Sequence, residues 1–275
     1  MLNRRVPTIF ALLILIVGFL SGLFGLTQFQ SLTSKATLAN HPSRVAFSNF
    51  MNNSFSVSWT TEEETTGMIF LENEKNFFGD DREGKNKGVQ KFLSHYITIS
   101  KIPSYDNTFF FTIMSGTAKY GSTHENNFYL TYVPDNDICE INDMPGVPRG
   151  CFPFRLKIPP TLGANTLARG PISGVVFHSD AKTPVSDGVV YFSFAGSSIS
   201  STTLREDGTW IVLLGGLRTQ DLRGYFTSEA GSPFFFSVYS GKEKLTFSCN
   251  GIDLASYAFP PLVFGKSFSC QIGNP

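Results

Sequence analysis

The sequence predicts an all-β protein of two β-sandwich domains behind an N-terminal transmembrane helix. Apolar residues make up 41% of the 275 residues and charged residues only 16%, with 28 phenylalanines among them. This composition is rich in strand-forming residues and poor in solvated helix faces. One long apolar segment lies near the N-terminus, and short alternating runs separated by Gly, Asn, Asp and Pro follow it. The length allows two domains of ordinary size.

Residues 1–30 are predicted to form a transmembrane signal-anchor. The run VPTIFALLILIVGFLSGLFGL, residues 6–26, carries no charge, and the next charged residue is Lys35. As a helix this run spans roughly 31 Å, close to the thickness of a bilayer's hydrocarbon core. Arg4 and Arg5 precede it and favour a cytoplasmic N-terminus. We therefore expect a single-pass protein of the cell membrane whose C-terminal part is extracytoplasmic.

A cleaved signal peptide is the alternative interpretation of this N-terminus. The motif ATLAN at 36–40 offers a cleavage site after Ala39, and cleavage would release a secreted protein. The apolar region of a signal peptide is usually only about 7–15 residues long, so the length of this run favours the anchor. Residues 31–41 are polar and rich in Ser and Thr, which is typical of a spacer between a membrane and a domain.

The first predicted strands form a hairpin within SRVAFSNFMNNSFSVSWTT. Apolar residues recur at every second position on both sides of the turn dipeptide Asn52-Asn53, which indicates one buried face. These apolar positions are Val45, Phe47, Phe55, Val57 and Trp59. We expect Trp59 to mark the core of the first domain.

Glu62, Glu63 and Glu64 follow this strand and raise the question of an acidic catalytic site. Neighbouring side chains of an extended segment point to opposite sides, so three adjacent carboxylates cannot converge on one substrate. We therefore expect a solvated loop. Further strands are expected in GMIFLEN, HYITISKIP and NTFFFTIMSG, with the charged, glycine-broken residues 79–91 as an exposed connection and FGDD as a charged turn.

This part of the chain resembles a fibronectin type III domain of the kind found in bacterial surface proteins. The resemblance rests on the strand SFSVSWTT, the acidic TEEETTG that leads into the third strand, and the aromatic strand NTFFFTIMSG. It implies a β-sandwich over residues 42–162, with a long insertion at about 117–150 and FPFRLKIPP as the last strand. Such domains usually carry a tyrosine in the sixth strand whose hydroxyl fixes the neighbouring corner, and this chain has three phenylalanines there. The corner contact should therefore be missing or supplied by Tyr105.

The second predicted domain covers residues 168–275. ISGVVF is expected to pair with DGVVYFSF, and a turn at Asp207-Gly208 is expected to join the strands of a hairpin that contains Trp210, the second core marker. The segments ISGVV, TPVSDGVV and TLREDGTW are similar to those of the carboxypeptidase-regulatory-like domain, a transthyretin-like β-sandwich. That domain accompanies peptidases without catalysing their reaction. The resemblance is good to about residue 217, and residues 218–275 add strand material.

Four cysteines suggest disulfides in an extracytoplasmic domain. They are Cys139, Cys151, Cys249 and Cys270. Proximity in the sequence favours pairing of the first with the second and of the third with the fourth, although four cysteines permit three connectivities. The spacings of 11, 97 and 20 intervening residues lack the CxxC pairs that are typical of zinc sites.

No constellation of residues predicts catalysis, a cofactor or a metal. The four histidines do not show HxH, HxxxH or HExxH spacing, and the nucleophile motif GxSxG is absent. One acidic loop could be considered for calcium through Asp135, Asp137, Glu140 and Asp143. The EF-hand pattern requires Gly where Glu140 stands, so a solvated loop is the favoured interpretation.

The predicted function is therefore that of a non-enzymatic, membrane-anchored cell-surface protein. Its two β-sandwiches would present loops and sheet edges to an unknown protein or glycan. The alternative is a noncatalytic accessory subunit of an envelope hydrolase that acts on polysaccharide or peptide. Lys plus Arg equal Asp plus Glu at 22 each, so no net charge favours nucleic acid.

Deletion of residues 1–30 tests the anchor. We expect the full-length chain to sediment with membranes and to resist extraction by carbonate, whereas the deleted chain should be soluble, because only the 6–26 run is long enough to cross a bilayer. The measurement is an immunoblot of fractionated cells. A full-length chain that appears in the medium, shortened at Ala39, would support cleavage instead.

Overall fold

The computed structural model describes nine ranges of the chain. They are residues 40–71, 77–82, 89–100, 108–120, 155–157, 160–163, 170–227, 231–250 and 258–268. These ranges contain strands and turns, which confirms the all-β prediction, and none of them holds a helix long and apolar enough to cross a membrane. The predicted span at 6–26 lies outside them, so the anchor stays a prediction.

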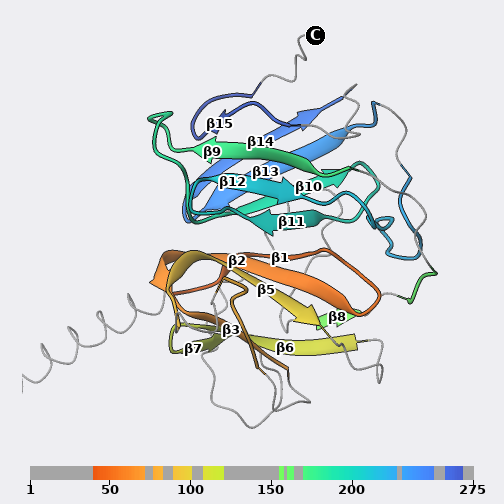
Figure 1. Ribbon diagram of the computed structural model, residues 1–275. Coiled ribbons are helices and arrows are strands. Elements are labelled where there is room, and N and C mark those ends of the chain that lie inside the picture. Colours follow the sequence, from red (N-terminus) through yellow and green to blue (C-terminus); the bar gives the residue numbers. More distant parts are fainter. Residues whose placement is uncertain are drawn as a thin grey trace, which may run out of the picture. The chain divides into compact units, whose positions relative to one another are not determined.

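The first sandwich consists of two antiparallel sheets, drawn in orange to yellow-green in Figure 1. One sheet has the order β1-β2-β5, and the other has the order β4-β3-β6-β7, with β8 also paired to β6. The bounds of the first sheet are β1 Ser43–Ser48, β2 Ser54–Thr65 and β5 Phe92–Ser100. Those of the second are β3 Gly67–Leu71, β4 Phe77–Gly79, β6 Thr108–Ser115, β7 Ala118–Tyr120 and β8 Arg155–Lys157.

The predicted hairpin and its apolar face are confirmed. β1 and β2 pair antiparallel with Phe47 opposite Val57, and the alternating apolar residues lie in the core between the two sheets. Trp59 is fully buried and stacks on the ring of His95 at 4.8 Å between centroids. Phe47 and Phe111 meet edge to face at 5.7 Å, which joins the two sheets.

The three glutamates are exposed, as expected, but they do not form a loop. Glu62, Glu63 and Glu64 belong to β2, which continues to Thr65 with an irregular register beyond Thr60. The strand survives there because Thr65 still pairs with Phe92 of β5. The loop prediction is corrected, and the prediction of solvated side chains is confirmed.

The second sandwich has a four-stranded sheet, β11-β10-β13-β14, and a three-stranded sheet, β12-β9-β15. The bounds of the first are β10 Val189–Phe194, β11 Ser200–Thr203, β13 Phe234–Ser240 and β14 Glu243–Cys249. Those of the second are β9 Ile172–Phe177, β12 Thr209–Val212 and β15 Leu262–Val263, the last parallel to β9. Trp210 is buried in the core between these sheets, against Phe236 and Phe259, which confirms it as a core marker.

Two predicted pairings in this half are wrong. β9 pairs with β12 and β15, whereas β10 pairs with β11 and β13, so the segments ISGVVF and DGVVYFSF lie in different sheets. The turn at Asp207-Gly208 forms, with the Gly208 amide donating to the Arg205 carbonyl and the glycine at a φ of 74°. However, the strands on its two sides enter opposite sheets. A turn between apolar runs cannot by itself distinguish a hairpin from such a crossover.

The polar face of β1-β2-β5 is buried as well, against the outer face of β11-β10-β13-β14 (Figure 1). The Oγ of Ser58 lies 2.7 Å from the Tyr191 hydroxyl, and the Oγ of Ser48 lies 2.6 Å from that of Ser201. A small apolar cluster fills the same contact. Its members are Ala46, Tyr96, Val189, Tyr191, Ile199 and Tyr239. The prediction of a single buried face is therefore corrected: the alternating serines face the second sandwich and not solvent.

A double-mutant cycle measures this contact. We expect Tyr191→Phe to lower the free energy of unfolding by about 1–3 kcal/mol, because it leaves the buried Ser58 hydroxyl without its partner. Ser58→Ala should cost a similar amount, and the double variant should cost clearly less than the sum of the two. Urea denaturation followed by tryptophan fluorescence gives all four values. Additive losses would show that the two hydroxyls do not interact.

Candidate functional site

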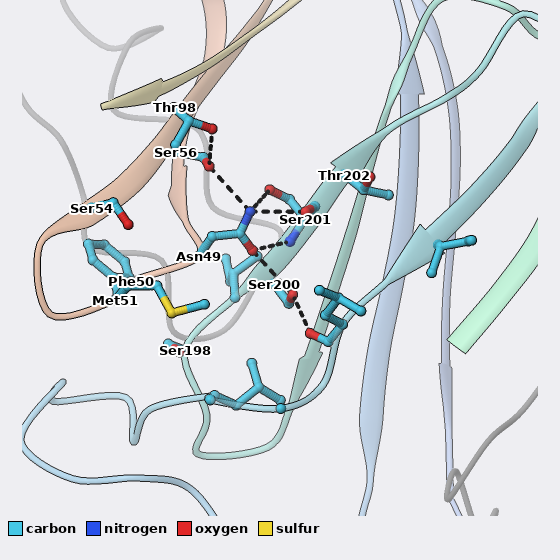
Figure 2. Close-up of a pocket in the computed structure, with 16 residues that line it drawn as sticks. Asn49, Phe50, Met51, Ser54, Ser56, Thr98, Ser198, Ser200, Ser201 and Thr202 are labelled. Atoms are coloured by element: carbon cyan, nitrogen blue, oxygen red, sulfur yellow. Dashed lines mark hydrogen bonds between the residues drawn. The ribbon is translucent and has the colours of Figure 1, made fainter. Parts of the chain in front are cut away.

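A cavity of about 270 Å³ lies at one end of the contact between the two sandwiches. Its wall is formed by the loop after β1, by residues of β2 and β5, by the residues around β11, and by β12 with the loop that follows it. Figure 2 shows the side chains that line it. The described residues that line it include serines, threonines, aliphatic side chains and one amide, and no Asp, Glu, His, Lys or Arg. This lining suits binding and supplies no general acid or base.

Asn49 joins the two sides of this cavity. Its backbone amide donates to the Ile199 carbonyl at 2.9 Å, and its side chain pairs with the backbone of Ser201 through two bonds of 2.9 and 3.0 Å. Asn49 has a φ of 53°, a left-handed conformation that asparagine tolerates better than most residues. Figure 2 shows its amide at the centre of the bonded group. The side-chain amide of Asn49 therefore stabilises the cavity wall.

The mouth of the cavity is apolar. Met51, Ile211 and Leu213 are 48%, 41% and 66% exposed, and all three line it. The described residues hold five exposed large hydrophobic side chains, so most of them gather at this one place. Clustered exposed apolar side chains mark interaction sites more often than single ones do. The cavity is therefore the candidate binding site.

A buried arginine fixes the chain segment beside the cavity. Arg218 is 1% exposed, and its guanidinium donates to the Pro160 carbonyl at 2.8 Å and to the Asn52 side-chain oxygen at 2.8 Å. Asn52 in turn exchanges two hydrogen bonds of 2.9 Å with the backbone of Leu162. Burial lowers the pKa of Arg218. The segment 160–163 between the two sandwiches is therefore held by both of them.

A second polar group links the sandwiches through charge. Arg82 donates to Asp80 at 2.9 Å and to Asp187 of the second sandwich at 2.8 Å, and it also donates to the Ser94 carbonyl. Asp187 accepts from the amide of Leu93 at 2.6 Å. The sequence interpretation of residues 79–91 as an exposed connection, with FGDD as a simple charged turn, is therefore wrong for Asp80, which is 3% exposed.

Asp80 also stands near a chain of buried polar side chains. Its carboxylate lies 3.6 Å from Nδ1 of His95, whose Nε2 lies 3.4 Å from the Thr65 hydroxyl. The Thr65 hydroxyl is 3.1 Å from that of Ser115. The order carboxylate, imidazole, hydroxyl is that of a hydrolase, but His95 is fully buried and Thr65 is 3% exposed. We interpret this series of hydrogen-bonding side chains as a polar part of the core.

The other predicted site residues are placed as follows. The acidic loop at 135–143 lies outside the described residues, as do Cys139, Cys151 and Cys270, so its solvation and the disulfide pairing stay predictions. Cys249 is buried at the end of β14. Within the described ranges, no three His, Cys, Asp or Glu side chains are close enough together to hold a metal ion.

Sequence reasoning missed the cavity. Its lining comes from segments about 150 residues apart in the sequence, such as Asn49 and Ser201. Its apolar mouth likewise combines two distant segments, with Met51 from one and Ile211 and Leu213 from the other. One signal was available in the run TWIVLL, which places Ile211 and Leu213 on the face opposite to Trp210 and Val212. A strand that buries one face has no need of apolar residues on the other.

Comparison with known proteins adds little. No family model and no curated protein matches the sequence. A solved structure, the crystal structure of chicken CNTN1 FN1-FN3 domains, is similar over 77% of this chain with 11% identity and a TM-score of 0.22. The match covers 65% of that structure's chain. A likeness at this level carries no argument for this chain's fold or function.

Acid titration tests the role of Asp80. Burial would raise its pKa, but the neighbouring His95 imidazole, the hydrogen bonds from Arg82 and the positive charge of Arg82 lower it from 3.8 to about 2. A carboxylate with a depressed pKa stabilises the fold above the unfolded-state pKa. We expect about 2 kcal/mol of stability from this group, lost as the pH falls from about 4 to 2.

The measurement is urea denaturation at a series of pH values. In Asp80→Asn this part of the acid dependence should be missing, and the stability at pH 7 should be lower, because Arg82 loses a buried partner. Glu63→Gln, a change at an exposed carboxylate, should keep the wild-type profile. Parallel profiles for wild type and Asp80→Asn would contradict the depressed pKa.

Proposed function

We propose that the chain is a non-enzymatic, membrane-anchored cell-surface protein that binds a partner at the cavity between its two β-sandwiches. In this proposal residues 6–26 hold the chain in the membrane, and residues 31–41 keep the sandwiches away from it. The bound partner is a protein or a glycan at the cell surface. No chemical step is assigned to the site.

One observation carries this proposal: the apolar side chains Met51, Ile211 and Leu213 are exposed together at the mouth of a cavity that both sandwiches line. Exposure of such a group is unfavourable in water and is offset when a partner covers it. The absence of any ionisable side chain among the described lining residues favours binding over acid–base chemistry.

The rigid walls of the cavity also support a binding role. Asn49 pairs with the backbone of Ser201 across the contact, and Arg218 and Asn52 hold the segment 160–163. A site whose walls are already fixed loses little conformational entropy when a ligand binds. The alternative role as an accessory subunit would use the same site in the same way.

Site-specific photo-crosslinking tests this function. A photoreactive amino acid is placed at Leu213 of the full-length chain in the cells that produce it, and at Phe77 as a matched control, because Phe77 is also exposed, at 62%, but does not line the cavity. We expect a defined adduct at position 213 in the membrane fraction, identified by mass spectrometry, and little at position 77. Equal labelling at both positions, or none at 213, would contradict the proposal.

A further inference from the structure

We propose that the free edge of β12, together with the cavity beside it, binds an extended peptide segment of a partner protein by main-chain pairing. Apolar side chains of that segment would enter the mouth of the cavity. This inference rests on the proposed binding function and specifies the ligand of that site. It follows from the direction of the backbone groups of β12, from the groups already used around it, and from the chemistry of the cavity wall.

The register of β12 decides which of its backbone groups point outward. β12 pairs antiparallel with β9, with Trp210 opposite Gly174 and Val212 opposite Ile172. The Val176 amide donates to the Gly208 carbonyl at 3.0 Å, so the backbone carbonyl of position 208 points toward β9. In an antiparallel pair, the residues whose backbone groups point toward the partner strand recur at every second position. The backbone groups of Trp210 and Val212 therefore also point toward β9. Ile211 and Leu213 therefore direct their backbone groups away from it.

Some of the backbone groups that point away from β9, in β12 and at Leu213 directly after it, already have hydrogen-bond partners. The remaining ones are available to an added strand. The Thr209 carbonyl accepts from the Arg205 amide at 2.9 Å, and the Leu213 carbonyl accepts from the Ser200 hydroxyl at 3.0 Å. The amide and carbonyl of Ile211 and the amide of Leu213 have no such partner among the described residues. Groups on residues two apart are what an added antiparallel strand would pair with.

This edge lacks the usual protection against strand addition. Natural edge strands carry charged residues, proline or bulges that prevent pairing with another chain. β12 consists of Thr209, Trp210, Ile211 and Val212, and its register with β9 is regular. Such an edge invites pairing, which is consistent with a peptide partner as its natural occupant.

The cavity wall favours an apolar peptide side chain over a sugar. Most of its polar groups are bonded to one another: the Asn49 amide pairs with Ser201, and the Ser200 hydroxyl is within bonding distance of Asn49 and Leu213. The exposed large side chains left for a ligand at the mouth, Met51, Ile211 and Leu213, are apolar. Sugars usually stack on exposed aromatic rings, but Phe50, the aromatic residue in the lining, is 3% exposed.

Binding of a defined peptide tests the inference. The probe is a fluorescein-labelled peptide of roughly seven residues that alternates Thr and Val, added to the full-length chain in lipid nanodiscs and followed by fluorescence anisotropy. A second probe has the same side chains but is N-methylated at alternate amides, so it cannot pair along one edge. We expect saturable binding of the first probe and at least about tenfold weaker binding of the second.

Two variants and one control locate the binding. Ile211→Pro removes one outward amide and leaves the bonds of Trp210 and Val212 to β9 in place, and proline is tolerated at the solvent side of an edge strand. Leu213→Asp removes the apolar side chain at the mouth. Each should weaken binding by about tenfold, whereas Phe77→Asp should change it less than about twofold. Circular dichroism and thermal melting show whether each variant folds. If Ile211→Pro does not fold, the binding measured with Leu213→Asp decides the result.

The outcomes separate this inference from the function it rests on. Equal binding of the two probes, equal binding by all variants, or no binding of the first probe would overturn strand addition. If the crosslink at position 213 still forms in cells, the cavity binds a partner in another way and the proposed function stands. Concentration-dependent self-association of the full-length chain that is lost in Leu213→Asp would replace the peptide by a second copy, and would also overturn the inference.

Discussion

The hydroxyl-rich face of β1-β2-β5 is buried against the outer face of β11-β10-β13-β14, and the arrangement of the rest of the structure depends on this contact. Hydroxyl groups lose hydration when they are buried, and this costs free energy unless a partner in the protein replaces the water. The pairs Ser58 with Tyr191 and Ser48 with Ser201 provide such partners across the contact. Burial raises the pKa of Tyr191, which keeps its hydroxyl neutral and able to donate.

A contact made by paired polar groups fixes geometry more strictly than an apolar one. Hydrogen bonds depend on distance and direction, whereas apolar contact depends mainly on area. The bonds at its margins act in the same way: Arg82 binds Asp187, and Arg218 binds Asn52. The two sandwiches therefore form one body, and the cavity between them has fixed walls. A freely jointed pair of domains could not hold such a site open.

The cavity combines properties that neither sandwich has alone. The first sandwich contributes Asn49 and Met51, and the second contributes Ile211 and Leu213 beside an unprotected strand edge. The buried polar side chains from Asp80 through His95 to Thr65 are closed to solvent and belong to the core of the first sandwich. Binding through shape and backbone pairing is the role that we propose for this arrangement.

The strand pattern and the positions of the two cores follow from the local sequence alone. Alternation with a period of two placed Phe47, Val57 and Trp59 correctly, because burial of one face of a strand leaves that pattern in any sheet. The tertiary structure decided what the small polar residues do. Ser58 has the same local pattern whether its face meets water or a second sandwich, because a serine hydroxyl can bond to either.

The pairing of the strands in the second sandwich also depends on the tertiary structure. The same is true of the location of the candidate site. An Asp-Gly turn between apolar runs permits a hairpin or a crossover, and the choice depends on which sheet each apolar face must cover. Asn49 and Ser201 lie about 150 residues apart in the sequence, and Asp80 stands in a run of charges that is typical of an exposed turn. Long-range contacts of this kind leave no local pattern, because residue types record what each position contacts but not which segment provides the contact.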